Sequence, residues 1–191
     1  MRNIGYHRLR VIEVPVGPIA DMPKGYSCRS VQPADLASFE IDVGPEVQAE
    51  RFASGFECLG IFDRHNELIA VTWLAKNQHE DSLLNIQFVL PHDAAWDTGM
   101  WIRDDRRMGR AFAAVWGAIK QWLQKEGLHR TMSSIADYNV QSIISHSRLG
   151  ARSLGYVTVV RVGRLQYARG ARPRWRFVGN GRKQTVLLPT R

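Results

Sequence analysis

The 191-residue sequence has few cysteines and no long apolar run. Its two cysteines, Cys28 and Cys58, cannot build a disulfide framework, so we expect a reducing, cytoplasmic compartment. No run approaches the roughly 20 apolar residues of a spanning helix, and the N-terminal residues lack the apolar core of a signal peptide. The six histidines are scattered without zinc-ligand spacing, so we expect no metal site.

Acidic residues are missing from one part of the chain. Residues 138–191 hold 11 basic and no acidic residues, whereas residues 1–137 hold 15 basic and 18 acidic ones, and the net charge is +8. This asymmetry predicts an anionic partner. Three interpretations are open. The arginines serve an anionic acceptor or lipid surface, or they bind nucleic acid with Trp175 and Phe177 stacking between them, or they form a solvated face that also attracts polyanionic CoA. Nucleic acid is disfavoured, because no recognised nucleic-acid module is present. The arginines concerned are Arg161, Arg164, Arg169, Arg172, Arg174 and Arg176.

The order of the expected elements predicts an α/β (α+β) protein with a mixed, mostly antiparallel central sheet flanked by helices. With 45% hydrophobic and 23% charged residues, the chain is long enough for one globular domain with a sizeable core. Residues 83–90 predict either a strand or a short helix. The other expected strands are 6–14, 26–31, 58–63, 68–75, a strand ending at 101–102, 131–135 and 155–165, followed by a last hairpin of 174–177 and 184–188; the expected helices begin at Pro33 and Pro45 and cover 107–126 and 140–149.

Two of the expected helices carry the clearest signals. The helix at residues 107–126 follows two acidic residues and stops at Gly127, which agrees with the helix-dipole and capping rules. The helix at residues 140–149 has Asp137 or Asn139 as its N-cap. We expect Phe112, Val115, Trp116, Ile119, Trp122 and Leu123 of the first helix, and Val140, Ile143 and Ile144 of the second, to face inward.

Residues 101–111 (WIRDDRRMGRA) contain the segment that most clearly indicates a binding site. A strand ends here and a tight turn opens the long helix with the pattern R-x-x-G-x-A. The first turn of a helix has unpaired N–H groups and the positive end of the dipole, so it can hold phosphate oxygens. Small residues at Gly109 and Ala111 permit close approach of the backbone. The alternative is a basic helix start with a tight turn and no ligand.

This segment resembles the acetyl-CoA signature of the GNAT superfamily of N-acetyltransferases, [QR]-x-x-G-x-[GA]. Two further landmarks follow the family's order. Residues 60–75 look like the hairpin before the cofactor strand, and residues 139–142 (NVQS) with 148–150 (RLG) resemble the family's N-x-x-[AS]…[KR]-L-G-F segment. The chain departs from the pattern at Ala151, where the family prefers Phe, and at Arg103, where it often has Pro. The likeness covers residues 26–168, leaving residues 1–25 as an N-terminal extension and 169–191 as a basic C-terminal extension, expected to be a β-hairpin on the same domain.

The resemblance implies a cofactor site for acetyl-CoA (acyl-CoA) between splayed strands. One strand before the signature would line the pantetheine arm, residues 133–135 would form the other lip, and the turn would hold the diphosphate. Arg103 would add charge nearby. Carried over residue by residue, the cofactor-binding set is Met100, Trp101, Ile102, Arg106, Arg107, Met108, Gly109, Arg110, Ala111, Asn139 and Ser142.

The resemblance also implies direct attack of an amine on the thioester within a ternary complex. His146 stands where family members often place a Tyr that protonates the leaving sulfur, so we take it as a candidate general acid; the alternative is an ordinary helix residue. Asp97 is the candidate general base, with Glu57 and the pair His92 and Asp93 as rivals. Each of these is also interpretable as a solvated loop residue.

The leading functional hypothesis is acetyl transfer to a primary amine of a small molecule, an amino sugar or amino acid. One alternative is transfer of a longer acyl chain from acyl-CoA or from an acidic acyl carrier protein, which the basic C-terminal region would suit. Another is a GNAT-like module that binds CoA without turnover. A homodimer through the edge of the last hairpin is a further expectation.

Overall fold

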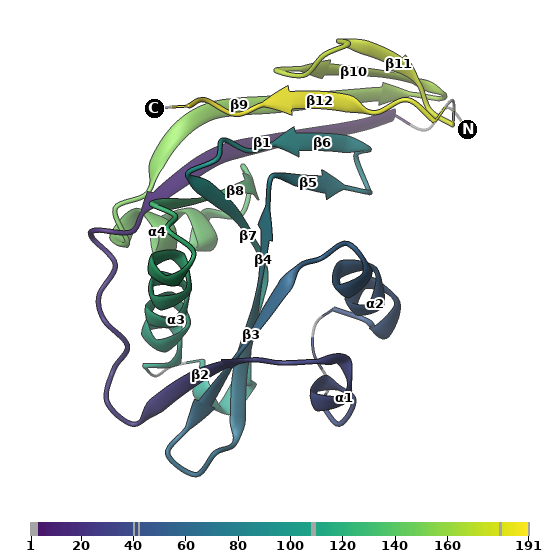
Figure 1. Ribbon diagram of the computed structural model, residues 1–191. Coiled ribbons are helices and arrows are strands. Elements are labelled where there is room, and N and C mark those ends of the chain that lie inside the picture. The colour runs from purple at the N-terminus through teal and green to yellow at the C-terminus, as the bar shows by residue number, and fades with distance from the viewer. Residues whose placement is uncertain (1–3, 40, 42, 108–109, 180, 191) are drawn as a thin grey trace. The chain divides into compact units, whose positions relative to one another are not determined.

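The computed structural model describes residues 4–39, 41, 43–107, 110–179 and 181–190 (Figure 1). The chain divides into two compact units assembled from separate segments: residues 1–15, 76–96 and 130–191 form the first, and residues 16–75 and 97–129 the second. Strands dominate both units and most paired strands run antiparallel, so the mixed α/β fold with few helices predicted from the sequence is confirmed. The domain boundaries expected after residues 25 and 168 stay a prediction.

The first unit contains a large sheet with the strand order β11-β10-β9-β1-β8-β7. Neighbours are antiparallel except β7 and β8, which pair in parallel over Ala94–Trp96 and Arg130–Met132. The start of β7 belongs to this unit and its remainder to the second, so the predicted splay of these two strands stays a prediction. The strands are β1 (Ile4–Pro15), β7 (Ala94–Ile102), β8 (Arg130–Ala136), β9 (Arg152–Val162), β10 (Leu165–Arg169) and β11 (Trp175–Phe177).

A three-stranded sheet completes the first unit, in the order β12-β6-β5. It contains β5 (Gln78–Asp81), β6 (Ile86–Val89) and β12 (Gln184–Leu187), and β12 runs parallel to β6. Residues 83–90 therefore contain a strand, and β5 was not predicted because its sequence, QHED, is polar. The predicted hairpin of residues 174–177 and 184–188 is wrong, since β11 pairs with β10 and β12 pairs with β6.

Helix α4 (Val140–Arg148) also belongs to the first unit. Its predicted N-cap is confirmed at Asn139, whose Oδ1 accepts a hydrogen bond from the Ser142 amide at 3.1 Å. The three residues expected to face inward are not fully buried. Ile143 is half-buried, whereas Val140 is 59% and Ile144 46% exposed, and α4 contains no fully buried residue.

The second unit has the strand order β7-β4-β3-β2. Strand β3 (Glu57–Asp63) is antiparallel to both of its neighbours, β2 (Tyr26–Ser30) and β4 (Leu68–Lys76). The hairpin predicted at residues 58–63 and 68–75 is confirmed, and both of its strands are almost entirely buried. Two short helices, α1 (Pro33–Leu36) and α2 (Pro45–Ala53), begin at prolines, as predicted.

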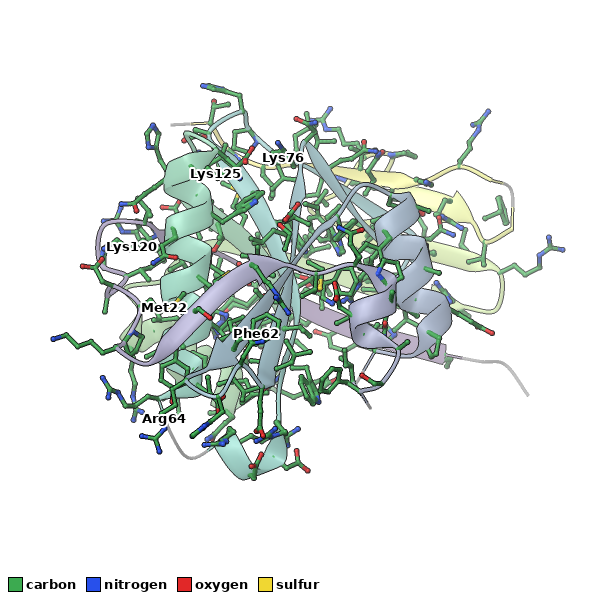
Figure 2. All side chains as sticks on the ribbon, turned by 60° about the horizontal axis from the view of Figure 1, so that its bottom comes forward. Met22, Phe62, Arg64, Lys76, Lys120 and Lys125 are labelled. Atoms are coloured by element: carbon green, nitrogen blue, oxygen red, sulfur yellow. The ribbon has the colours of Figure 1, made fainter. Side chains whose placement is uncertain are left out.

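Helix α3 (Ala111–Lys125) packs through the apolar side that the sequence indicated, although Phe112 is only half-buried. It begins four residues later than predicted, and a 3-10 turn at Asp104–Arg106 precedes it. The loop of residues 16–25 lies against α3: Lys120 donates to the Ile19 carbonyl at 2.8 Å and pairs with Asp21 at 2.8 Å. Figure 2 labels Met22 and Lys120 in this region.

Candidate functional site

The N-terminus of α3 is the candidate anion-binding position in the second unit. Arg110 is its N-cap, the first turn holds no acidic residue, and no side chain of a described residue caps it. A backward helical bond runs from the Ala114 amide to the Arg110 carbonyl at 2.9 Å. Because the first amides of an α-helix have no acceptor within that helix, the amides of residues 111–113 are the candidates to meet a ligand oxygen. Met108 and Gly109 lie outside the described residues.

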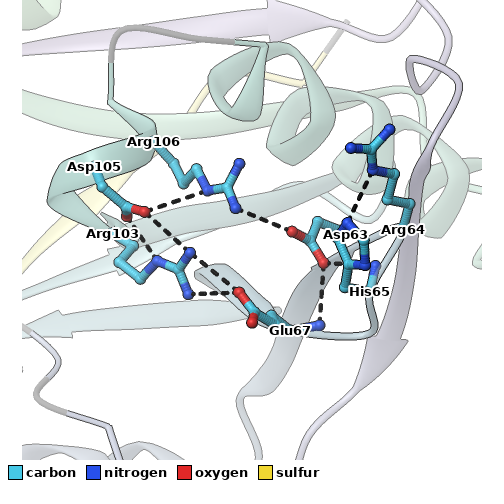
Figure 3. A network of polar contacts seen from close by, with 7 residues as sticks. All are labelled: Asp63, Arg64, His65, Glu67, Arg103, Asp105 and Arg106. Carbon is cyan, nitrogen blue, oxygen red and sulfur yellow. Dashed lines mark hydrogen bonds and ion pairs between the residues drawn. The ribbon is translucent and has the colours of Figure 1, made fainter.

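Two arginines before this helix are held in a carboxylate network (Figure 3). Arg103 Nε donates to Asp105 Oδ1 at 2.6 Å, and its Nη1 lies 3.2 Å from Glu67 Oε2. Arg106 Nη2 lies 3.2 Å from Asp63 Oδ2, and its Nε lies 3.4 Å from Asp105 Oδ2. This network joins the turn of residues 103–106 to the β3–β4 turn within the second unit.

The arginines of this network help to lower the pKa values of two of its carboxyl groups, those of Asp105 and Asp63. The hydrogen bond from Arg103 lowers the pKa of the Asp105 carboxyl below its ordinary value. Burial would raise the pKa of Asp63, but the backbone N–H groups of His65 and Glu67 and the charge of Arg106 outweigh burial and lower it. Both carboxylates therefore stay charged near neutral pH and neutralise Arg103 and Arg106.

The other two arginines of the turn are exposed. Arg107 pairs with Asp104 at 3.0 Å and donates from Nε to the Ile102 carbonyl at 3.2 Å. Arg110 forms no ion pair with any residue in the described part of the chain. Of the four arginines around the predicted diphosphate site, Arg107 and Arg110 are thus the ones positioned to meet an anion from solvent.

The predicted residues of β7 differ in their surroundings. Trp101 is 7% exposed and packs in an apolar cluster with Leu36, Phe62 and Trp73, so its side chain is a core residue. Met100 and Ile102 are half-buried, and Asp97 is 7% exposed. Asp97 is the one candidate base on the strand of the predicted cofactor site.

Arg51 is a residue that the sequence reasoning missed. It projects from α2 toward β7 in the second unit, where its guanidinium lies beside Gly99, a residue with φ +61° at which any side chain would clash with Arg51. Its carbon Cζ lies 5.3 Å from the centroid of the Trp73 ring. Nη1 is buried without a hydrogen-bond partner among the described residues, and burial lowers the pKa of the group. Arg51 as a whole is half-buried, and a cation with a buried donor that lacks a partner is a candidate position for an anionic group. No local sequence pattern reveals it, because α2 and β7 are far apart in the chain.

The remaining predicted site residues lie on α4 in the first unit. Asn139 Oδ1 is occupied by the helix cap. Nδ1 of the half-buried His146 lies 2.7 Å from the Ser142 carbonyl oxygen and 3.3 Å from the Ser142 hydroxyl. Because a carbonyl only accepts, Nδ1 carries a proton, and Nε2 can donate one only when the ring is a cation. The helix thus fixes the tautomer of His146.

The rival bases have structural partners. Asp93 accepts a hydrogen bond from Arg130 at 3.0 Å in the first unit, and Glu57 accepts one from the Ser30 hydroxyl in the second. His92 is exposed. Among the described residues, no cluster of His, Cys, Asp and Glu could hold a metal ion, and no helix is long and apolar enough to cross a bilayer.

Comparison with known proteins shows the fold. Neither protein-family models nor curated proteins match the sequence. Solved structures do match: a tandem GNAT protein from the clavulanic acid biosynthesis pathway has a TM-score of 0.57 at 13% identity, over 85% of this chain and 55% of that one. A GNAT-family protein from Novosphingobium aromaticivorans has a TM-score of 0.53 at 15% identity, over 85% of this chain and 67% of that one.

A third match is the glucosamine N-acetyltransferase region of a fungal multi-domain β-N-acetylglucosaminidase, with a TM-score of 0.57 at 10% identity, over 83% of this chain and 21% of that one. The chain spans about half the length of the tandem protein. These likenesses establish that the chain has the GNAT acetyltransferase fold.

Proposed function

We propose that the protein is an acyl-CoA-dependent N-acyltransferase that transfers acetyl from acetyl-CoA to a primary amine of a small molecule. The observation that carries this proposal is the N-terminus of α3, which begins at the last residue of the R-x-x-G-x-A segment and is capped by no side chain of a described residue, in a chain with the GNAT fold. A helix end of this kind suits a diphosphate. The amides of residues 111–113, with Arg107 and Arg110, would hold it.

The reaction is a direct acyl transfer. The amine nitrogen forms a bond to the thioester carbonyl carbon, the carbon–sulfur bond breaks, and the departing sulfur takes a proton as the amine loses one. In this proposal His146, as a cation with Nδ1 held by the Ser142 carbonyl, donates from Nε2. The buried Asp97 is the candidate acceptor of the amine proton.

Arg51 supports an acceptor that carries a carboxylate. The Nη1 donor of Arg51 is buried without a hydrogen-bond partner among the described residues. It lies beside Gly99, which belongs to β7, the strand that would line the cofactor. A charge-assisted hydrogen bond to a carboxylate satisfies such a donor better than a sugar hydroxyl does. Of the two acceptor classes that the sequence left open, an amino acid is therefore favoured over an amino sugar.

The experiment is a thiol-release assay with acetyl-CoA and a panel of amino acids, their amides and amino sugars. The protein's own thiols interfere little, because burial and the charge of Glu57 raise the pKa of Cys28 to about 11 and that of Cys58 to about 12. We expect release with amino acids, a KM at least about tenfold higher for the amides, and loss of that discrimination in Arg51→Met.

The outcomes separate the alternatives. Tight CoA binding without thiol release from any amine would contradict catalysis and favour a binding module. Release only from long-chain acyl-CoA or an acylated carrier protein would favour the longer-chain alternative. Unchanged turnover of acetyl-CoA in His146→Phe would remove His146 as the acid, and an unchanged acidic limb of the pH–rate profile in Asp97→Asn would remove Asp97 as the base.

A further inference from the structure

Four strands of the first unit, in the order β11-β10-β9-β1, present rows of side chains on one face. Their registers align residues across the strands, and alternate residues along each strand share a face. Three rows follow one another along the strands. We call them the apolar row (Ile4, Val162, Leu165 and Phe177), the aromatic row (Tyr6, Val160, Tyr167 and Trp175) and the arginine row (Arg8, Thr158 and Arg169).

The opposite face of these strands is covered. Val157, Val159 and Ala168 are at most 2% exposed. Gln166 on that face is fully buried and donates from Nε2 to the Leu84 carbonyl at 2.7 Å and to Gln184 Oε1 at 2.8 Å. The three-stranded sheet of β5, β6 and β12 therefore packs on that face, beside β9 and β10 (Figure 1). The three rows point the other way.

Large side chains on the outward face are exposed to solvent. Tyr6 is 64%, Trp175 59% and Phe177 62% exposed. The other five tryptophans of the chain are at most 8% exposed, so Trp175 stands apart from them. A contiguous exposed patch of aromatic and aliphatic residues marks a binding surface.

Cations accompany the aromatic rings. Arg8 Cζ lies 4.2 Å from the centroid of the Tyr156 ring, and Arg8 and Arg10 pair with Asp137 at 3.6 and 3.2 Å. Arg169 is exposed and forms no ion pair with a described residue. A hollow of about 530 Å³ lies over these residues, lined by Tyr6, Arg8, Tyr156, Thr158, Tyr167 and Arg169.

We propose that this face binds single-stranded nucleic acid, with bases stacked on the aromatic row and phosphates on the arginine row. Exposed aromatic residues on a four-stranded sheet stack two or three bases in known RNA-binding domains, and the aromatic row crosses four strands, roughly 14 Å. Phosphates suit Arg169 and the guanidinium of Arg8, and the absence of acidic residues after Asp137 keeps the surrounding field positive.

Two other occupants fit less well. A second copy would bring two surfaces of the same charge together. A flat lipid surface would meet the apolar row and Arg164, but it would leave the hollow lined by Tyr6, Arg8 and Arg169 unfilled. The sequence disfavoured nucleic acid because no sequence module is present. Sequence patterns do not reveal the rows, because each row takes its residues from three or four different strands.

The test is fluorescence anisotropy of a labelled oligouridylate of about 12 nucleotides, titrated with the full chain between about 50 and 200 mM salt. Quenching of the protein's tryptophan fluorescence is followed in parallel, since Trp175 is the tryptophan within reach of a base. We expect Trp175→Ala to weaken binding at least about fivefold, and Trp175→Phe to retain most of it. Phe177→Ala, on the same strand but in the apolar row, is the matched control and should stay within about twofold of wild type.

Arg169→Ala should lower the slope of log affinity against log salt by about 0.7. Arg64→Ala, which removes the same charge from the second unit, should leave that slope unchanged. Absence of binding at about 50 mM salt, unquenched tryptophan fluorescence, or equal effects of Arg64→Ala and Arg169→Ala would each overturn the proposal. A dimer in sedimentation, lost in both Phe177→Ala and Trp175→Ala and unable to bind the oligonucleotide, would assign the face to a second copy instead. Circular dichroism confirms that each variant is folded.

Discussion

Arg130 Nη1 lies 2.6 Å from Glu13 Oε2 in the first unit, and the two side chains are only 3% and 4% exposed. The same guanidinium donates from Nη2 to Asp93 at 3.0 Å and to the Pro189 carbonyl at 3.2 Å. Arg130 thus links β1, β8, the residues before β7 and the residues after β12. Replacing only one residue of such a buried ion pair lowers the free energy of unfolding strongly, because the partner left behind stays buried and charged.

Glu13→Leu should lower the free energy of unfolding by about 3–5 kcal/mol, since it leaves the Arg130 guanidinium without its shortest contact. The double variant Glu13→Leu with Arg130→Met should lose markedly less, because the one charge that it leaves without its partner, Asp93, is 19% exposed and can be hydrated. Urea denaturation of the wild type, both single variants and the double variant measures the coupling. Additive losses would show that the two residues act independently.

The loss of unfolding free energy at acidic pH should depend in part on Asp93. Burial would raise the pKa of its carboxyl, but the hydrogen bond and charge of Arg130 outweigh burial and lower it below the ordinary value. A lowered folded-state pKa means stabilisation that is complete above the unfolded value of about 3.9 and is lost as pH falls through the folded value. Asp93→Asn should therefore destabilise the protein at about pH 6 and much less at about pH 3. In an Arg130→Met background this pH dependence should be lost or reversed, because burial then acts on the carboxyl without the opposing charge of Arg130.

Ala113→Glu tests the open end of α3, where Ala113 is exposed in the first turn. A carboxylate there interacts favourably with the helix dipole and should raise stability by about 0.3–1 kcal/mol. It should also repel the CoA diphosphate and weaken CoA binding by about fivefold. Gln124→Glu, at the other end of the helix, is the control and should slightly lower stability without affecting CoA. Raised stability with unchanged CoA affinity would place the diphosphate elsewhere.

Gly117→Ala should destabilise the protein although it improves helix propensity. A Cβ at Gly117 would lie 2.5 Å from Met22 Cα and 2.7 Å from Met22 N in the second unit. The propensity gain is about 1 kcal/mol, whereas forcing the loop away costs about 1–3 kcal/mol or more. Thermal unfolding measures the net loss. Because the clash is with backbone, Met22→Ala should not relieve it; full relief in that background would identify a side-chain contact instead.

The sequence predicted those parts of the fold whose signals are local. The β3–β4 hairpin has two apolar runs around a polar turn, and α4 has its cap at Asn139. The prediction of the last hairpin was wrong because contacts with residues distant in sequence hold β12 in place. One of them is the hydrogen bond that the buried Gln184 receives from Gln166. Nothing near residue 184 encodes that choice.

The same distinction holds for the candidate site. The long helix and the basic turn before it follow from neighbouring residues, so they were predictable to within four residues at the helix start. Binding of a diphosphate at this helix start stays a prediction. The neutralisation of Arg103 and Arg106 was not predictable, because their partners Glu67 and Asp63 lie 36 and 43 residues earlier in the chain. Arg51 escaped for the same reason, since only the folded second unit brings it to Gly99.

The parallel pairing of β12 with β6 dictates an order of events during synthesis. β6 emerges from the ribosome about a hundred residues before its partner, yet Ile86 and Phe88 in β6 are fully buried in the finished sheet. Until residue 187 has been translated, β6 keeps a bare apolar edge of the kind that recruits other chains. A chain whose synthesis pauses before residue 187 is therefore expected to aggregate more readily than the completed protein.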